Sequence, residues 1–571
     1  MSLSDKYPAA AVAAAAASTL VVAAALAYYL LAPAKPVLRP RSLKLPAPPH
    51  LQPDPSLDSP SLASPGAAAA SFPDPIQGQS QIPVSIIDKH LTDFTVRDKV
   101  LRGVFISHKF KSDVPAIIFV HGMGGQMEQF VFQIEHFSTV ANVAAYDMVG
   151  NGQSAATLRD EDYTTDSLVD DLVALVQLIQ TQHSIGSFVL VCHSYGCAIA
   201  TKASQRLESL LKAIVFIAPK ALHTEHDQAR VNSFVSTSTP LIEVFRWRDR
   251  YGGINSQSVN RYVAPSAPTV VREFQLKWNA SVKTTTAKRY YKGINWVTPN
   301  DYGEIKAPLL LISGQHDKAV PANSAAVIKE HATGSSCVSD LFVVPNVGHS
   351  VMFESPNIVN AIVYKFLTDV GLKEISLRDQ ILKETEGVPK WGLKNYQKWK
   401  RITPVATTAV RGSFFRPMKV LKEDDDEHTP VAFATSNPEI GLVIDISLDH
   451  PPYEPENLVK SGCQYHKLST VSKIPPSQGN VNDFKAVVDG FWAENPDRHI
   501  AVHCHYGFNR TGFLICCYLI ECKGFSVADA IQAFADARPP GIRHMHFKDE
   551  LFYRYVVSDS LRQAQGDPKS N

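Results

Sequence analysis

Short apolar segments alternate with segments of helical length over much of this 571-residue chain. Five such runs lie between residues 116 and 314, and they read AIIFVHG, VAAYD, FVLVCHS, AIVFIAP and LLLISG. Strands that are buried on both faces have this composition, because helices cover both sides of a parallel sheet. The alternation therefore predicts an α/β fold built on a parallel sheet.

The chain is too long for one hydrophobic core, because single cores stop growing at about 250 to 300 residues. We expect a first α/β domain at 85–372, a charged helical connector at 373–398, a second α/β domain at 399–557 and a tail at 558–571. A less hydrophobic stretch at about 222–300 predicts a cap inserted over a pocket. The formal net charge of +1 predicts no general affinity for polyanions, so any contact with nucleic acid must be local.

The N-terminal region predicts a membrane anchor and a tether. After an eight-residue tail at 1–8, residues 9–31 carry no charge and are long enough to cross about 30 Å of hydrocarbon as a single-pass transmembrane helix. A cleaved signal peptide and an alanine-rich soluble helix remain alternatives. The proline-rich segment 32–84 reads as a semi-extended linker.

Charge and cysteine usage indicate the side of the membrane. Lys35, Arg39, Arg41 and Lys44 follow the apolar run, and this bias predicts that the catalytic domains face the cytosol, at the endoplasmic reticulum or the mitochondrial outer membrane. The eight cysteines lack the spacing of a disulfide scaffold or a zinc site, which indicates a reducing compartment.

The first domain contains a candidate catalytic triad. Ser194 lies in CHSYG, between an apolar strand and a helix start, as a nucleophile elbow requires, although Cys192 replaces the usual first glycine. A serine hydroxyl needs a base, and the base needs an acid that fixes its tautomer. Asp317 and His349 follow in loops after later strands and supply these groups in the order Ser, Asp, His.

An oxyanion hole is expected from the backbone N–H groups of Met123, in FVHGMGG, and of Tyr195. These motifs resemble the α/β-hydrolase family over about 85–370. The resemblance implies an esterase, a lipase or a related acyl hydrolase with a hydrophobic ester substrate. Some members of the fold keep the triad and act only as binding proteins, so an inactive binding platform stays an alternative.

The second domain contains HCHYGFNRTG, a strand end, a turn and a helix start. Backbone N–H groups and the helix N-terminus converge there on one anion, and they favour a Cys504 thiolate that attacks phosphorus while Arg510 clamps two oxygens. Thr511 eases departure of the sulfur, and His503 holds the loop. The residues expected to bind phosphate are His505, Tyr506, Gly507, Phe508, Asn509, Arg510 and Thr511.

This stretch resembles the cysteine-dependent dual-specificity phosphatases, and more closely the RNA 5′-triphosphatase domain of animal mRNA capping enzymes. The likeness covers about 399–555 and includes RGSFFRPMK, GLVIDIS and ARPPGIRHMHFKDELFYRY. It implies that Asp445 supports the phosphate loop. The chain has no K-x-D-G guanylyltransferase motif, so it does not cap RNA alone.

The leaving group follows from a missing acid. Phosphatases of this class that cleave phosphoesters carry an aspartic acid about 30 residues before the cysteine, but residues 468–481 contain no acidic residue. A phosphate leaves without a proton donor more readily than a phenol does, because its second pKa is about 6 rather than about 10. The sequence therefore favours phosphoanhydrides, with triphosphate RNA ends the leading candidate.

Taken together, the motifs predict a membrane-anchored bifunctional hydrolase that needs neither a metal nor a cofactor. Two alternatives remain open. One is a protein tyrosine, dual-specificity or phosphoinositide phosphatase with a non-catalytic hydrolase-like domain. In the other, the phosphatase fold is a lipid-recognition module that guides a lipase. The acyl substrate and the oligomeric state stay open.

Overall fold

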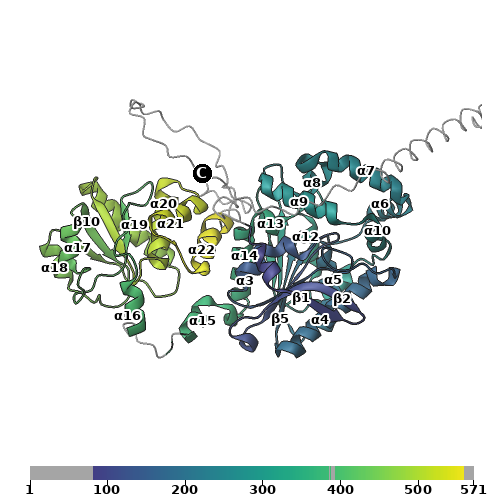
Figure 1. The fold of residues 1–571 in the computed structure, drawn as a ribbon, viewed down its shortest axis with the longest axis horizontal. Coiled ribbons are helices and arrows are strands. Elements are labelled where there is room, and N and C mark those ends of the chain that lie inside the picture. Colours follow the sequence, from purple (N-terminus) through teal and green to yellow (C-terminus); the bar gives the residue numbers. More distant parts are fainter. Residues whose placement is uncertain (1–81, 385, 387–392, 559–571) are drawn as a thin grey trace, which may run out of the picture. The chain divides into compact units, whose positions relative to one another are not determined.

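The computed structural model describes residues 82–384, 386 and 393–558 (Figure 1). The expected anchor at 9–31 and most of the expected linker lie outside these residues. Within the described ranges, no helix combines the length and the apolar character needed to cross a membrane.

The first unit is built on an eight-stranded sheet with the order β1-β2-β4-β3-β5-β6-β7-β8 (Figure 1). Its strands are β1 (Leu91–Val96), β2 (Lys99–Ile106), β3 (Ala116–Val120), β4 (Asn142–Tyr146), β5 (Phe188–His193), β6 (Leu211–Ile217), β7 (Leu309–Gly314) and β8 (Val338–Val344). All pairs from β4 to β8 are parallel, whereas β1 and β2 form an antiparallel hairpin that joins the edge of β4. The sequence analysis did not predict this hairpin, whose edge strand alternates polar and buried residues.

Helices cover both faces of this sheet. Successive side chains of a strand point to opposite faces, so each strand contributes to two cores. Ile118 and Val120 pack with α4 and α5 in one core, while Ile117 and Phe119 pack with α3 and α14 in the other. The helices outside the cap are α2 (Ser85–Lys89), α3 (Val131–Phe137), α4 (Thr165–His183), α5 (Tyr195–Arg206), α12 (Ser324–His331), α13 (Val351–Glu354), α14 (Pro356–Asp369) and α15 (Leu377–Glu384). The predicted α/β architecture with two covered faces is confirmed.

Six helices lie between β6 and β7 and form a cap. They are α6 (Glu225–Ser236), α7 (Thr239–Tyr251), α8 (Gln257–Tyr262), α9 (Thr269–Ser281), α10 (Thr284–Lys292) and α11 (Pro299–Gly303). Helix α6 buries no residue and α7 buries only Ile242. This segment is less hydrophobic than the sheet because its first helices are largely exposed.

The second unit has a four-stranded parallel sheet with the order β11-β10-β12-β9. Its strands are β9 (Phe415–Met418), β10 (Ile440–Asp445), β11 (Gln464–Lys467) and β12 (His499–His503). Its helices are α16 (Leu393–Lys400), α17 (Pro430–Ser436), α18 (Pro455–Lys460), α19 (Gln478–Glu494), α20 (Asn509–Lys523), α21 (Val527–Ala537) and α22 (Met545–Phe552), and a π-helical turn, η7 (Tyr553–Val557), follows α22.

Two cores flank this smaller sheet. Ile500 and Val502 of β12 pack with α19, α20 and α21, whereas Ala501 packs on the opposite face with α17 and α18. The central strands β10 and β12 end at Asp445 and His503, and their carboxyl ends lie side by side because the strands are parallel neighbours. Side chains that follow these strands therefore meet at one edge of the sheet, where ligands bind in open α/β sheets.

Candidate active sites

Ser194 occupies a sharp turn between β5 and α5. Its φ of 53° and ψ of −117° lie in a region that side-chain-bearing residues rarely adopt. Two residues later, a Cβ on Gly196 would lie 2.5 Å from the carbonyl oxygen of Val120, so only glycine lets α5 approach β3 this closely. The strained turn exposes the Ser194 hydroxyl at the carboxyl end of the sheet, as a nucleophile elbow does.

His349 and Asp317 form a buried pair beside this elbow. His349 Nδ1 lies 2.7 Å from Asp317 Oδ2, with side chains 4% and 0% exposed. The other carboxylate oxygen accepts the N–H groups of Ala319 and Val320, each at 2.8 Å. These bonds fix the carboxylate, which in turn fixes the orientation of the imidazole.

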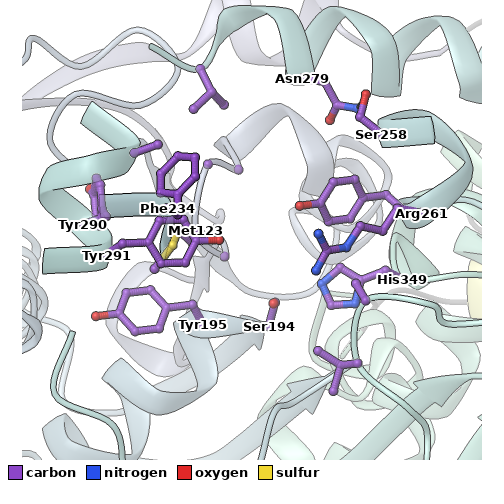
Figure 2. A pocket seen from close by; sticks show the side chains of 18 of the residues that line it. Met123, Ser194, Tyr195, Phe234, Ser258, Arg261, Asn279, Tyr290, Tyr291 and His349 are labelled. Atoms are coloured by element: carbon purple, nitrogen blue, oxygen red, sulfur yellow. Dashed lines mark hydrogen bonds between the residues drawn. The ribbon is translucent and has the colours of Figure 1, made fainter. Parts of the chain in front are cut away.

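The two residues expected to form the oxyanion hole flank the elbow. Met123 and Tyr195 line the same pocket as Ser194 (Figure 2), and the N–H of Tyr195 at the start of α5 has no intrahelical acceptor. His121 holds the loop before Met123: its Nε2 accepts the N–H of Met148 at 2.9 Å, and its Nδ1 donates to the Gly122 carbonyl at 2.7 Å. Burial lowers the pKa of His121 to about 4, so the ring stays neutral.

A pocket of about 970 Å³ opens between Ser194 and the cap. Figure 2 shows Ser194, Tyr195 and His349 at its base, with Phe234 and Tyr291 of the cap directed into it. Sequence reasoning missed two groups that hold the histidine loop against the cap, and no motif marks them. The Tyr262 carbonyl accepts the N–H of His349 at 2.8 Å, and Glu354 accepts the N–H groups of Gly348 at 2.9 Å and Ala264 at 2.8 Å.

The Cys504 loop joins β12 to α20 in the second unit. Gly507 has a φ of +72°, and a Cβ there would lie 2.0 Å from the Met418 carbonyl oxygen, so the turn tolerates no side chain. Burial alone would raise the pKa of Cys504, but Arg510, the Thr511 side chain and backbone N–H groups of the loop outweigh it and hold that pKa below its ordinary value. The sulfur is therefore suited to be a thiolate, the nucleophilic form of cysteine.

Arg510 and Thr511 lie in the first turn of α20. Arg510 Nη1 donates to the carbonyls of Thr470 at 2.7 Å and Ile446 at 3.2 Å, which fixes the guanidinium and leaves the remaining N–H groups for an anion. The Thr511 side chain lowers the pKa of Cys504. Its hydroxyl oxygen is buried and has no other hydrogen-bond partner among residues 82–384, 386 and 393–558.

His503 and Asp445 brace the loop from the strand ends. His503 is fully buried; its Nδ1 lies 3.0 Å from the Cys504 carbonyl oxygen and its Nε2 lies 2.8 Å from the Tyr453 hydroxyl. Asp445 accepts from Ser447 through Oδ1 and from Lys467 at 2.7 Å through Oδ2. Burial would raise the pKa of Asp445, but His503, Lys467 and Ser447 outweigh it and lower that pKa.

The other predicted loop residues have separate contacts. Asn509 Oδ1 accepts the N–H groups of Arg543 at 2.8 Å and His544 at 3.1 Å, which ties the 541–546 segment to the loop. The carbonyls of His505 and Tyr506 accept from Val420 N at 3.1 Å and Arg538 Nη2 at 3.1 Å. The guanidinium of Arg543 stacks 3.7 Å from the ring centre of Phe508, and that of Arg538 lies 5.1 Å from it.

Sequence reasoning gave no role to a group of cations beside this loop. Burial and the charges of His546, Lys398, Lys473 and Arg543 lower the pKa of His544 to about 4. Three basic side chains from three segments therefore act on the imidazole of His544, whose backbone N–H is bound by Asn509 of the Cys504 loop. Within the part of the chain that the structure describes, no cluster of three His, Cys, Asp or Glu residues could hold a metal ion.

Family comparisons agree with this geometry. The family model of the α/β-hydrolase fold matches residues 115–356, and that of the dual-specificity phosphatase catalytic domain matches residues 426–555. The chain joins a hydrolase-fold domain to a dual-specificity phosphatase domain. Both resemblances found in the sequence are thereby confirmed.

Relatives match the two domains separately. The phosphatase domain is similar to an RNA/RNP complex-1-interacting phosphatase of Bos taurus, with 35% identity over 27% of this chain and 50% of that protein. It is also similar to an mRNA-capping enzyme of Caenorhabditis elegans, with 38% identity over 20% of this chain and 19% of that enzyme. The chain thus spans at most half the length of these relatives. The hydrolase-fold domain is similar to an abhydrolase domain-containing protein of Schizosaccharomyces pombe, with 23% identity over 50% of this chain and 80% of that protein.

Proposed function

We propose that this chain is a bifunctional hydrolase in which a serine ester hydrolase is fused to a cysteine phosphatase. The buried Asp317–His349 pair beside the strained Ser194 turn supports the first activity. In this mechanism His349 takes the hydroxyl proton as Ser194 attacks an ester carbonyl, and the N–H groups of Met123 and Tyr195 stabilise the oxyanion. The protonated His349 then gives its proton to the leaving alcohol, and water hydrolyses the acyl-serine by the same route.

Labelling by a serine-directed fluorophosphonate tests this activity. The intact protein is expected to be labelled, and Ser194→Ala is expected to lose both labelling and ester turnover. Phosphatase turnover of that variant is expected to stay unchanged, because Ser194 and Cys504 follow strands of two different sheets. A wild-type protein that is folded but not labelled would instead favour a non-catalytic binding domain.

In the phosphatase domain the Cys504 thiolate attacks the terminal phosphorus while Arg510 and the loop N–H groups hold the phosphoryl oxygens. The bond from phosphorus to the bridging oxygen breaks, and a phosphocysteine forms. Water then cleaves the P–S bond, and the Thr511 hydroxyl stabilises the departing thiolate. This route uses no metal ion in either step.

We further propose that the substrate is a phosphoanhydride, with a triphosphate RNA end the leading candidate. The observation that carries this proposal is the hydrogen bonding of Asp445, the last residue of β10, which pairs with the strand β12 that leads into Cys504. Its carboxylate oxygens accept hydrogen bonds from Ser447, Tyr465 and Lys467. The contacts of Asp445 lower its pKa and so favour the carboxylate over the acid form that a proton donor needs. The names of two relatives of the phosphatase domain refer to RNA. The basic residues Lys398, Lys473 and Arg543 also support a polyanionic substrate.

Turnover on three substrates at equal concentration tests the preference. Release of phosphate from triphosphate-ended RNA is expected to exceed release from a phosphotyrosine peptide or a phosphoinositide, and to persist in EDTA. Cys504→Ser and Arg510→Ala are expected to abolish it. A higher kcat/KM on the phosphopeptide or the phosphoinositide would contradict the anhydride assignment.

We also propose that the chain is anchored to a membrane, with both domains in the cytosol. The proposal rests on the uncharged segment 9–31 and the basic residues after it. Exposed apolar side chains on cap helix α7, including Trp247 and Tyr251, suit the interfacial region of a bilayer. The full-length protein is expected to resist carbonate extraction, and added protease is expected to digest both domains in sealed microsomes or intact mitochondria. Full protection would contradict this topology.

A further inference from the structure

The pocket above Ser194 is lined by an excess of cations. Five basic side chains and two acidic ones contribute to its wall. The basic residues are Lys220, Arg230, Arg246, Arg250 and Arg261, and the acidic ones are Asp227 and Asp249. A neutral ester needs no positive charge in its binding pocket. A basic side chain that pairs with another residue of the protein has a structural role, whereas an unpaired one is available to a ligand.

Three of the five cations are satisfied by the protein itself. Lys220 pairs with Asp227 at 2.5 Å. Arg246 and Arg250 both pair with Glu243, at 3.7 Å and 3.3 Å. Arg246 also donates to the Val282 carbonyl at 2.6 Å. These groups hold the cap helices together.

Arg230 and Arg261 differ from the other three. Neither guanidinium has a hydrogen bond or an ion pair with any residue that the structure describes. The guanidinium of Arg261 lies 6.0 Å from the ring centre of Tyr262. Both guanidinium groups act on the Tyr291 phenol of the pocket wall, where they oppose the rise in pKa that burial causes. Arg230, Arg261 and Tyr291 all line the pocket.

The position of Arg261 is tied to the catalytic loop. It precedes Tyr262, whose carbonyl accepts the N–H groups of His349 at 2.8 Å and Ser350 at 3.0 Å. Figure 2 shows the Arg261 guanidinium directed into the pocket that Ser194 and His349 line. The backbone next to Arg261 is thus joined directly to the loop that carries His349.

We infer that Arg261, assisted by Arg230, binds an anionic group of the ester substrate and so determines the specificity of the hydrolase domain. This inference rests on the proposed ester hydrolysis at Ser194. A guanidinium presents paired N–H donors that match a carboxylate or a phosphate, and both anions satisfy the geometry. Phe234, Ile242 and Phe245 supply apolar wall for the hydrocarbon part, so the substrate class is an amphiphilic ester with a carboxylate or phosphate headgroup.

Calorimetric titration of the full chain with ether analogues, which are not hydrolysed at Ser194, tests the site directly. The probes are neutral 1-O-octylglycerol, its 3-phosphate, and octyloxyacetate as the carboxylate. Cys504→Ser combined with Arg510→Ala is the background, so that the second domain does not bind the phosphate. At least one anionic probe is expected to bind tenfold or more tightly than the neutral one, and the comparison of the two identifies the headgroup.

Arg261→Gln is expected to weaken the preferred anion about tenfold while binding of 1-O-octylglycerol is unchanged, and Arg261→Lys to weaken it less. Arg248→Gln is the matched control, because Arg248 is an exposed cation of the cap outside the pocket. Unchanged anion binding in Arg261→Gln, or an equal loss for the neutral probe, would overturn the inference. If the proposed ester hydrolysis is wrong but the anion site is present, the protein is not labelled by the fluorophosphonate and still binds the anionic probe.

Discussion

His349 Nδ1 lies 2.7 Å from Asp317 Oδ2, and both side chains are almost completely buried. The other oxygen of Asp317, Oδ1, accepts two backbone N–H groups, and these bonds hold the carboxylate in place. Its Oδ2 is therefore available to accept the proton on His349 Nδ1. That leaves Nε2 as the basic nitrogen for the serine hydroxyl.

Asp317→Asn is expected to lower kcat for ester hydrolysis by about a thousandfold or more, because an amide favours the wrong imidazole tautomer. The fold is expected to stay intact, since Asn has the same shape. Steady-state kinetics and circular dichroism measure the two effects. Asp340→Asn is the control, because Asp340 is an exposed carboxylate on β8 that pairs with Lys329. Equal activity in the Asp317 and Asp340 variants would refute the triad.

Cys504 is expected to react with iodoacetamide at a lower pH than the other cysteines, since Arg510, Thr511 and the loop N–H groups lower its pKa. Mass spectrometry of alkylation against pH measures the apparent pKa of each thiol. Cys522 is exposed, and partial desolvation and the nearby carboxylates of Asp489 and Glu521 raise its pKa, so it is the internal control. Thr511→Ala is expected to shift the Cys504 curve to higher pH, and a curve that does not move would remove Thr511 from this role.

Asp445→Asn is expected to destabilise the phosphatase domain by about 3 kcal/mol, because it leaves Lys467 without its buried partner. The folded pKa of Asp445 lies below the unfolded value of about 3.9. Its stabilisation is therefore present above pH 3.9 and is lost as the pH falls through the folded pKa.

Hydrogen exchange in β10 and β11 measures this loss, with exposed Asp483→Asn as the control. Phosphatase activity of the remaining folded Asp445→Asn protein is expected to keep its dependence on pH. If the fall in phosphatase activity at high pH disappears in Asp445→Asn, Asp445 is instead identified as a proton donor.

Arg543→Gln is expected to raise KM for triphosphate-ended RNA several-fold, with a smaller effect on 4-nitrophenyl phosphate. Arg543 lies over Phe508 beside the loop, where it meets phosphates beyond the one that is transferred, and the simple aryl phosphate has none. Arg411→Gln, which changes an exposed arginine that stacks on Phe525, is the control. Steady-state kinetics at two salt concentrations measures the effect, because phosphate contacts weaken with salt. Equal losses on both substrates would mean that Arg543 only shapes the loop.

The local motifs could be predicted because their chemistry is local. The turn at Ser194 and the loop from Cys504 to Arg510 each lie within a few residues of a strand and a helix, so the strand, the turn and the helix start are visible in the sequence. The alternation of apolar runs predicted the parallel sheets for the same reason, since strand burial leaves its mark on consecutive residues. The β1–β2 hairpin was missed because its edge strand is only half apolar.

Contacts between distant segments were decided only by the tertiary structure. The sequence alone identified two candidate nucleophiles, the residues next to them, and a stretch at 468–481 without an acidic residue. It did not show which basic side chains lack partners, because Arg246 and Arg261 are the same residue type in the same cap segment. Folding gives Arg246 an acceptor in Val282 and leaves Arg261 facing the pocket. Ion pairing depends on distances between side chains that the cap brings together, and no local pattern in the chain encodes those distances.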